Sequence, residues 1–159
     1  MLDANWSQST QRLNNVKALV VQLLGKMGYG GQIKDSGEVT AASNDGGIDG
    51  IIKEDVLGFG RIHIQAKRYA ADNTVGRPDI QNFVGALAVS QSSKGIFITT
   101  SSFSSGAVEY ANSLNGNPTL VLLDGQQLAQ YIYDYGMGMH TDHTLHIKRL
   151  DTDFWDGFE

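Results

Sequence analysis

The stretch "RIHIQAKRY", Arg61–Tyr69, decides the fold because it predicts a strand whose end carries polar side chains. Ile62 and Ile64 alternate with polar residues, and such alternation is typical of a half-buried β-strand. Side chains two residues apart in a strand face the same way, so Gln65 and Lys67 project to one side. An amide and an ammonium group therefore follow the apolar run on one face of the predicted strand.

The residues before this stretch predict its partner strand. The apolar run in "GIDGIIKE" is followed by the glycine-bearing loop "DVLGFG", which leads into Arg61–Tyr69. Two apolar runs joined in this way predict a β-hairpin. Because antiparallel pairing brings the start of one strand beside the end of the next, we expect Asp49 to lie near Gln65 and Lys67.

Such a cluster suits hydrolysis of a phosphodiester. The Asp49 carboxylate, the Gln65 amide oxygen and the Ala66 carbonyl are ligands of the kind that Mg²⁺ or Mn²⁺ prefers. A bound metal lowers the pKa of a water molecule, and the Lys67 ammonium can stabilise charge that develops on the phosphate. The same residues also allow a structural role, in which Asp49 bonds its own loop and Lys67 extends to solvent. The spacing alone leaves both interpretations open.

The rest of the chain predicts an α/β fold with a mixed sheet flanked by helices on both faces, because nearly apolar strands alternate with amphipathic helices. We expect one domain over residues 1–159, with 1–8 and 151–159 flexible or peripheral. The expected helices are 9–27, 77–89, 105–114 and 125–136, and the further strands are 94–101, 118–124 and an edge strand at 143–150.

Composition and charge limit the class of protein. The chain has no cysteine, which excludes disulfides, and no apolar run approaches the roughly 18 residues of a membrane span. With no signal-peptide pattern at the N-terminus, we expect a cytoplasmic protein that does not bind membranes. The net charge of −5 argues only weakly against nucleic-acid binding, because five basic and two acidic residues lie between Arg61 and Lys94. This local excess allows either a basic strip or an ordinary mixture of solvated surface charges.

Five segments together carry a family resemblance. They are "NDGGIDGIIKED", "IHIQAKRY", "VGRPDIQNFVGAL", "KGIFITTSSFS" and "LVLLDGQQLAQYIYDYGMG". From about Leu13 to Leu150 the chain resembles the catalytic domain of Mrr-type restriction endonucleases, in the PD-(D/E)xK nuclease superfamily. The resemblance implies a restriction-endonuclease-like fold and a Mg²⁺-dependent endonuclease acting on double-stranded DNA. It assigns a metal-ligand role to Asp49, a ligand-side role to Gln65 and the catalytic role to Lys67.

The chain departs from this family at one position of the first helix. Family members commonly carry a glutamate twelve residues before the position of Tyr29, and this chain has Lys17 there. Metal binding is then weaker, or another acid replaces the glutamate; Glu38, Asp45 and Glu54 are the candidates. The alternative function is a catalytically weak or inactive DNA-binding or regulatory module that keeps the nuclease fold. A relative that recognises DNA junctions is a third interpretation.

The resemblance also bears on partners. Mrr-type enzymes usually carry a separate N-terminal DNA-recognition domain, which we expect to be absent from this chain. A homodimer is a further expectation, because cutting two strands commonly needs two sites. Arg68 and Arg77 flank the predicted site and are candidates for phosphate contacts, or else ordinary surface charges.

Two weaker patterns remain open. The hydroxyl-rich run "TTSSFSS" suits either backbone phosphates or capping of the helix that follows. His140, His143 and His146 recur at three-residue steps, which would cluster on a helix, but the surrounding sequence predicts loop and strand instead.

Overall fold

The computed structural model describes residues 16–30, 37–39 and 48–157. Its centre is a five-stranded sheet in the order β1-β2-β3-β5-β7. The two junctions β1–β2 and β2–β3 are antiparallel, whereas β3–β5 and β5–β7 are parallel. The strands are β1 (Gly37–Val39), β2 (Gly50–Lys53), β3 (Arg61–Lys67), β5 (Lys94–Thr99) and β7 (Thr119–Leu123). The mixed sheet that the sequence predicts is therefore confirmed.

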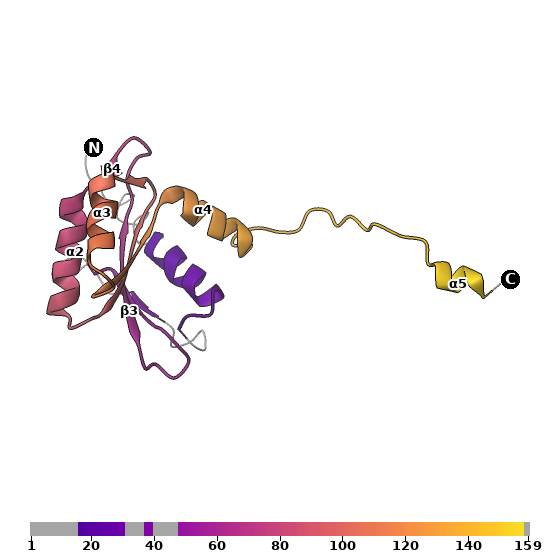
Figure 1. Cartoon of the computed structure of the whole chain (residues 1–159), viewed down its shortest axis with the longest axis horizontal. Coiled ribbons are helices and arrows are strands. Elements are labelled where there is room, and N and C mark those ends of the chain that lie inside the picture. Colours follow the sequence, from indigo (N-terminus) through magenta and orange to yellow (C-terminus); the bar gives the residue numbers. More distant parts are fainter. Residues whose placement is uncertain (1–15, 31–36, 40–47, 158–159) are drawn as a thin grey trace, which may run out of the picture.

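Helices cover both faces of this sheet (Figure 1). The helix at residues 16–26 and α4 (Gly125–Asp134) pack on one face, and α2 (Arg77–Val89) and α3 (Ser105–Ser113) pack on the other. A second, two-stranded parallel sheet joins β4 (Thr74–Val75) to β6 (Ser102–Phe103) beside α2 and α3. Neither of these short strands is among the strands that the sequence predicts.

Each face of the sheet has its own apolar core, because alternate residues of a strand point to opposite faces. Ile62 and Ile64 of β3 join the core under the helix at residues 16–26 and α4. Phe97 of β5 joins the core under α2 and α3, where its ring meets Phe83 edge-on at 5.6 Å between centroids. By the same alternation His63, Gln65 and Lys67 face the α2 side, so the polar side chains at the end of the strand lie beside α2.

Gly95 sets how closely α2 approaches the sheet. A Cβ atom at this position would lie 2.7 Å from Leu87 Cδ1 and 2.9 Å from Phe83 Cε1. Both neighbours are fully buried side chains of α2 and have little room to move. Helix α2, which also borders the candidate site, therefore packs directly on the backbone of β5.

The C-terminal region differs from the sequence prediction. Residues 143–150, expected as an edge strand, have no regular secondary structure and are exposed. A strand forms only where a neighbouring strand satisfies its backbone, and the chain leaves α4 in a direction away from the sheet (Figure 1). The prediction of a strand in this position is therefore wrong. The segment ends in a short exposed helix, α5 (Thr152–Asp156).

The predictions for the N-terminal residues fall partly outside the described part of the chain. The first predicted helix is present at 16–26, while its expected start at residues 9–15 lies outside them, as do residues 1–8. No helix in the described part of the chain is both long and apolar enough to cross a membrane.

Candidate functional site

Asp49 lies where β2 begins and β3 ends. Its backbone N–H donates to the Ile64 carbonyl at 2.8 Å, and its Oδ2 accepts a hydrogen bond from the Ala66 N–H, also at 2.8 Å. The side chain thus continues the β2–β3 ladder where the backbone diverges from it. The hairpin brings Asp49 to the Gln65–Lys67 segment, as the sequence predicts.

The second oxygen of Asp49 binds a lysine from the helix at residues 16–26. Lys17 Nζ lies 2.7 Å from Asp49 Oδ1, and the two side chains are only 13% and 18% exposed. The same carboxylate therefore carries an ammonium on one oxygen and a backbone N–H on the other. Nothing in the sequence alone reveals this ion pair, because its partners come from segments that meet only through tertiary packing.

Lys67 is held from the α2 side of the sheet. Its ammonium forms an ion pair with Asp79 Oδ1 and lies 3.4 Å from the Tyr69 hydroxyl. Asp79 Oδ2 also accepts the Gly76 N–H at 3.3 Å, at the start of α2. Among residues 16–30, 37–39 and 48–157, no ion pair or hydrogen bond joins Lys67 to Asp49 directly.

Asp79 is a site residue that the sequence analysis missed. Its place in the first turn of a helix, three residues after Gly76, is the pattern of a capping box, which indicates only a helix start. The structure shows that the same carboxylate also positions the Lys67 ammonium.

The pKa of Lys67 is raised above its ordinary value. Burial alone would lower it, but the hydrogen bonds to Asp79 and Tyr69 and the negative charge of Asp79 outweigh that effect. Lys67 is therefore a cation at neutral pH. In this state it can stabilise a negative charge or orient a water molecule, but it cannot accept a proton.

Gln65 contributes an unusual acceptor. Its Oε1 atom is shielded from solvent and has no hydrogen-bond partner among the residues that the structure describes. A buried acceptor left without a partner costs roughly 1–3 kcal/mol, so such atoms commonly mark a place for a water molecule or an ion. Within the described ranges, the Nδ1 atom of His63, two residues earlier, also has no hydrogen-bond partner. Burial, and then the charge of Arg61, lowers the pKa of His63, which keeps this imidazole neutral.

The side-chain and backbone oxygens at this end of β3 are of the chemical type that a hard divalent cation prefers as ligands. Asp49 offers a carboxylate, and the unpartnered Gln65 Oε1 suits a cation. The Ala66 carbonyl faces the same edge as its N–H, because both groups of an extended residue point to one side. The described ranges contain no group of three His, Asp or Glu side chains arranged for a metal, so these would be few and mostly neutral ligands.

The structure places the side chain of only one of the three acids that could replace the missing glutamate. Glu54 pairs with Lys94, 2.6 Å from Oε1, near the start of β3 and thus at the end opposite Asp49. It cannot serve the candidate site. Glu38 is described only in its backbone, within β1, and Asp45 lies outside the described residues.

The remaining candidates are placed as follows. Arg68 and Arg77 are both exposed, and the Arg77 guanidinium lies 5.1 Å from the centre of the Tyr110 ring. In "TTSSFSS", Ser104 caps α3 and Thr100 bonds both backbone groups of Tyr69, which favours a structural role for that run. His140, His143 and His146 lie in the exposed C-terminal segment and form no cluster there.

The mixed sheet flanked by helices is the fold of restriction endonucleases. The restriction endonuclease model Mrr_cat matches residues 11–132, and the chain belongs to this family of Mrr catalytic domains. It is 39% identical over 140 residues to the type IV methyl-directed restriction enzyme EcoKMrr of Escherichia coli strain K12. That match covers 88% of this chain and 44% of the relative, so the chain spans less than half of the relative's length.

Solved structures show the same fold at low sequence identity. The modification-dependent restriction endonuclease AspBHI superposes with a TM-score of 0.59 at 21% identity, over 79% of this chain and 32% of its own. MspJI, solved with a 27-mer oligonucleotide, gives 0.55 at 20% identity, over 82% and 30%. The protein of unknown function AF1548 gives 0.60 at 16% identity, over 88% and 73%.

Proposed function

We propose that the chain is a metal-dependent endonuclease that hydrolyses phosphodiester bonds in double-stranded DNA. The observation that carries the proposal is the hydrogen bond from the Ala66 N–H to Asp49 Oδ2. It fixes a carboxylate against the segment that holds Gln65 and Lys67, in a chain of the restriction endonuclease family. The relative EcoKMrr is a restriction enzyme, which makes DNA the substrate to test.

Asp49, Gln65 and the Ala66 carbonyl would hold Mg²⁺ or Mn²⁺. When bound, the metal supplies an activated water and neutralises phosphate charge. The chain's own contribution is positional and electrostatic. Lys67, kept protonated and oriented by Asp79, places a positive charge where negative charge develops on the phosphate. Arg68 and Arg77 are exposed on the flanks and would contact the DNA backbone.

Cleavage of supercoiled plasmid tests this proposal. We expect nicking or linearisation in Mg²⁺ or Mn²⁺, none in EDTA, and a loss of about 100-fold or more in Asp49→Asn. Asp134→Asn, at the exposed end of α4, is the matched control and should cleave normally. Methylated and unmethylated plasmids should both be tried, since EcoKMrr is a methyl-directed enzyme. Cleavage by Asp49→Asn at the normal rate would refute the assigned site.

The Lys17–Asp49 ion pair favours a second candidate function, a DNA-binding module with weak or no cleavage. A divalent cation must displace an ammonium 2.7 Å from Asp49, in a pair whose side chains are largely shielded from water. The cation would compensate the Asp49 carboxylate but would leave the shielded Lys17 ammonium without its anionic partner, which carries a cost. Metal binding at Asp49 is therefore opposed by this contact.

Calorimetric titration with Mn²⁺ separates the two candidates. If Lys17 opposes the metal, Lys17→Gln should bind Mn²⁺ about tenfold more tightly, which is about 1.4 kcal/mol. Lys26→Gln, on the same helix but exposed, should bind like the unchanged protein. Equal affinities in all three proteins, together with plasmid cleavage by the unchanged protein, would eliminate the non-catalytic candidate.

A further inference from the structure

We propose that residues 143–150 are an arm that adds a strand to the outer edge of β7 in a second copy of this chain. The partner's arm would do the same in return, so that two copies close into a homodimer. The proposal stands independently of the catalytic assignment, because its residues lie apart from Asp49 and Lys67.

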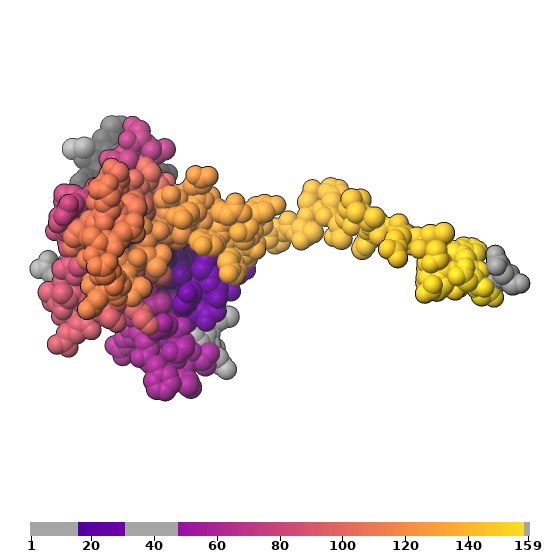
Figure 2. Space-filling view, in the orientation of Figure 1, coloured from indigo at the N-terminus to yellow at the C-terminus, as the bar shows by residue number. Residues whose placement is uncertain are grey.

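The arm has the pattern of a strand without a neighbour to pair with. Leu145 and Ile147 alternate with His146 and Lys148, and the two apolar side chains are 85% and 88% exposed. In the described part of the chain, no backbone hydrogen bond links residues 139–150 to the sheet. Figures 1 and 2 show the segment running away from the domain into solvent. Its alternation therefore predicts a partner strand that this copy does not supply.

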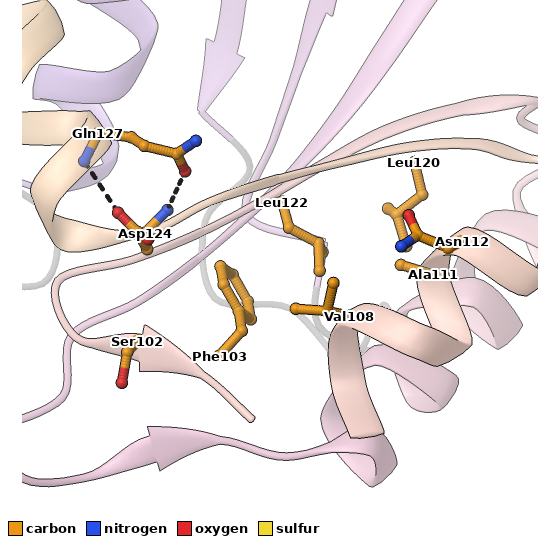
Figure 3. A pocket seen from close by; sticks show the side chains of 9 residues that line it. All are labelled: Ser102, Phe103, Val108, Ala111, Asn112, Leu120, Leu122, Asp124 and Gln127. Carbon is orange, nitrogen blue, oxygen red and sulfur yellow. Dashed lines mark hydrogen bonds between the residues drawn. The ribbon is translucent and has the colours of Figure 1, made fainter. Parts of the chain in front are cut away.

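The outer edge of β7 offers such a partner. β7 is the last strand of the described sheet and pairs only through its inner edge, with β5. Beside it lies an open hollow of about 380 Å³ with a mixed lining (Figure 3). Its apolar side chains include Leu120 and Leu122 of β7, Phe103 of β6 and Val108 of α3, and its polar ones are Ser102, Asn112, Asp124 and Gln127. An exposed strand edge beside a hollow with apolar side chains in its lining is an arrangement that can capture an extended segment by strand addition.

The arm and the hollow match in spacing and in charge. Leu145 and Ile147 are two residues apart, as are Leu120 and Leu122, so an added strand could direct both apolar side chains into the hollow. Residues 143–150 contain Lys148 and Arg149 and no acid. Asp124 is the charged residue among those lining the hollow, and it stands at one end of it (Figure 3).

The position of the arm favours a second copy over the chain's own edge. The arm follows α4, which packs on the core that contains Leu128. The hollow lies on the opposite, α3 side of the sheet, where Leu122 packs on the other core. The arm also points away from its own domain (Figure 1). If two copies exchange their arms, each arm can reach the β7 edge of the other copy while it still points away from its own domain.

Disulfide trapping tests the contact directly, because the chain has no cysteine. Full-length Val108→Cys and Ile147→Cys proteins are mixed under mild oxidation, and we expect a covalent heterodimer. The matched control replaces Ile147→Cys by His146→Cys, whose side chain faces away from the hollow, and should crosslink several-fold more slowly. Crosslinking at the same rate in both mixtures, or no crosslinking in either, would contradict the proposed placement of Ile147 against Val108.

Light scattering of the unmodified chain tests the dimer. We expect the mass of two copies, a single-copy mass for the Leu145→Asp, Ile147→Asp double variant, and a dimer for the Thr144→Asp, His146→Asp control. A monomer at every concentration would contradict the proposal. So would a Val108→Cys, Ile147→Cys double variant that closes its disulfide only within one chain, because the arm would then bind its own edge.

Discussion

Two ion pairs hold the charged groups at the end of β3, each with a partner from a different helix. Lys17 of the helix at residues 16–26 binds Asp49, and Asp79 of α2 binds Lys67. Each pair neutralises a group that the proposed reaction needs charged and accessible. In the proposed reaction a divalent cation would compete with Lys17 for Asp49, and a DNA phosphate would compete with Asp79 for Lys67. Binding of the two ligands would then exchange one charged partner for another at each group.

Asp79 should act as a positioning residue for Lys67. In Asp79→Asn the ammonium loses its anionic partner but keeps the Tyr69 hydroxyl, so we expect reduced cleavage with a larger effect on kcat than on KM. Asp79→Glu should restore part of the rate. The split between kcat and KM is the measurement, and a normal kcat in Asp79→Asn would contradict the role.

The Lys67–Asp79 pair also predicts a pH dependence of stability. The pKa of Lys67 is raised in the folded protein, so its stabilising contribution is complete below the ordinary value of 10.5 and is lost as pH rises through the folded value. The effect should be about 1 kcal/mol or less, because both side chains are partly exposed. Urea unfolding at neutral and at strongly alkaline pH measures this change in the free energy of unfolding. In Asp79→Asn, the free energy of unfolding should fall less as the pH is raised, because the Lys67–Asp79 pair is missing.

At the scale of elements, hydrophobic periodicity predicted most of the fold. The alternation in β3 and the helical spacing in α2 reflect burial on one face, which is a local property of the sequence. The same reasoning failed for residues 143–150, because alternation reports the capacity to form a strand and not the presence of a neighbour. It also missed the β4–β6 pair, since strands of two residues carry too short a pattern to detect.

The ion pairs of the site could not be predicted in the same way. Hairpin geometry predicted that Asp49 lies at the Gln65–Lys67 segment, where it contacts the Ala66 N–H, because that contact is local in the sheet. The contacts of Lys17 and Asp79 depend on how two helices pack across opposite faces of that sheet. No spacing along the chain encodes that packing directly.

The packing of α2 on β5 makes a prediction with a built-in control. Gly95→Ala should destabilise the fold by roughly 1–3 kcal/mol, because the new methyl collides with Leu87 and Phe83. Gly85→Ala, exposed within α2 and with nothing near its Cβ, should be neutral or stabilise by up to about 1 kcal/mol. Denaturant unfolding of both variants measures this difference in stability. Equal stability of Gly95→Ala and Gly85→Ala would contradict the prediction.

At the scale of the whole molecule, an acidic protein would have to bind a polyanion through a local basic surface. The net charge is −5, so DNA affinity should depend on the few exposed bases near the site. Arg68→Ala and Arg77→Ala should each weaken DNA binding and reduce the slope of log affinity against log salt by about 1. Fluorescence anisotropy across salt concentrations measures this, and unchanged slopes would remove both arginines from the interface.

The most direct test of the central claim is plasmid cleavage in Mn²⁺ by three purified proteins: the unchanged chain, Lys67→Ala and Lys53→Ala. Lys53 is an exposed lysine at the end of β2, far from the candidate site, and controls for loss of a surface charge. The account predicts metal-dependent cleavage by the unchanged chain and Lys53→Ala, and a loss of about 100-fold or more in Lys67→Ala. Equal cleavage by all three proteins would contradict it.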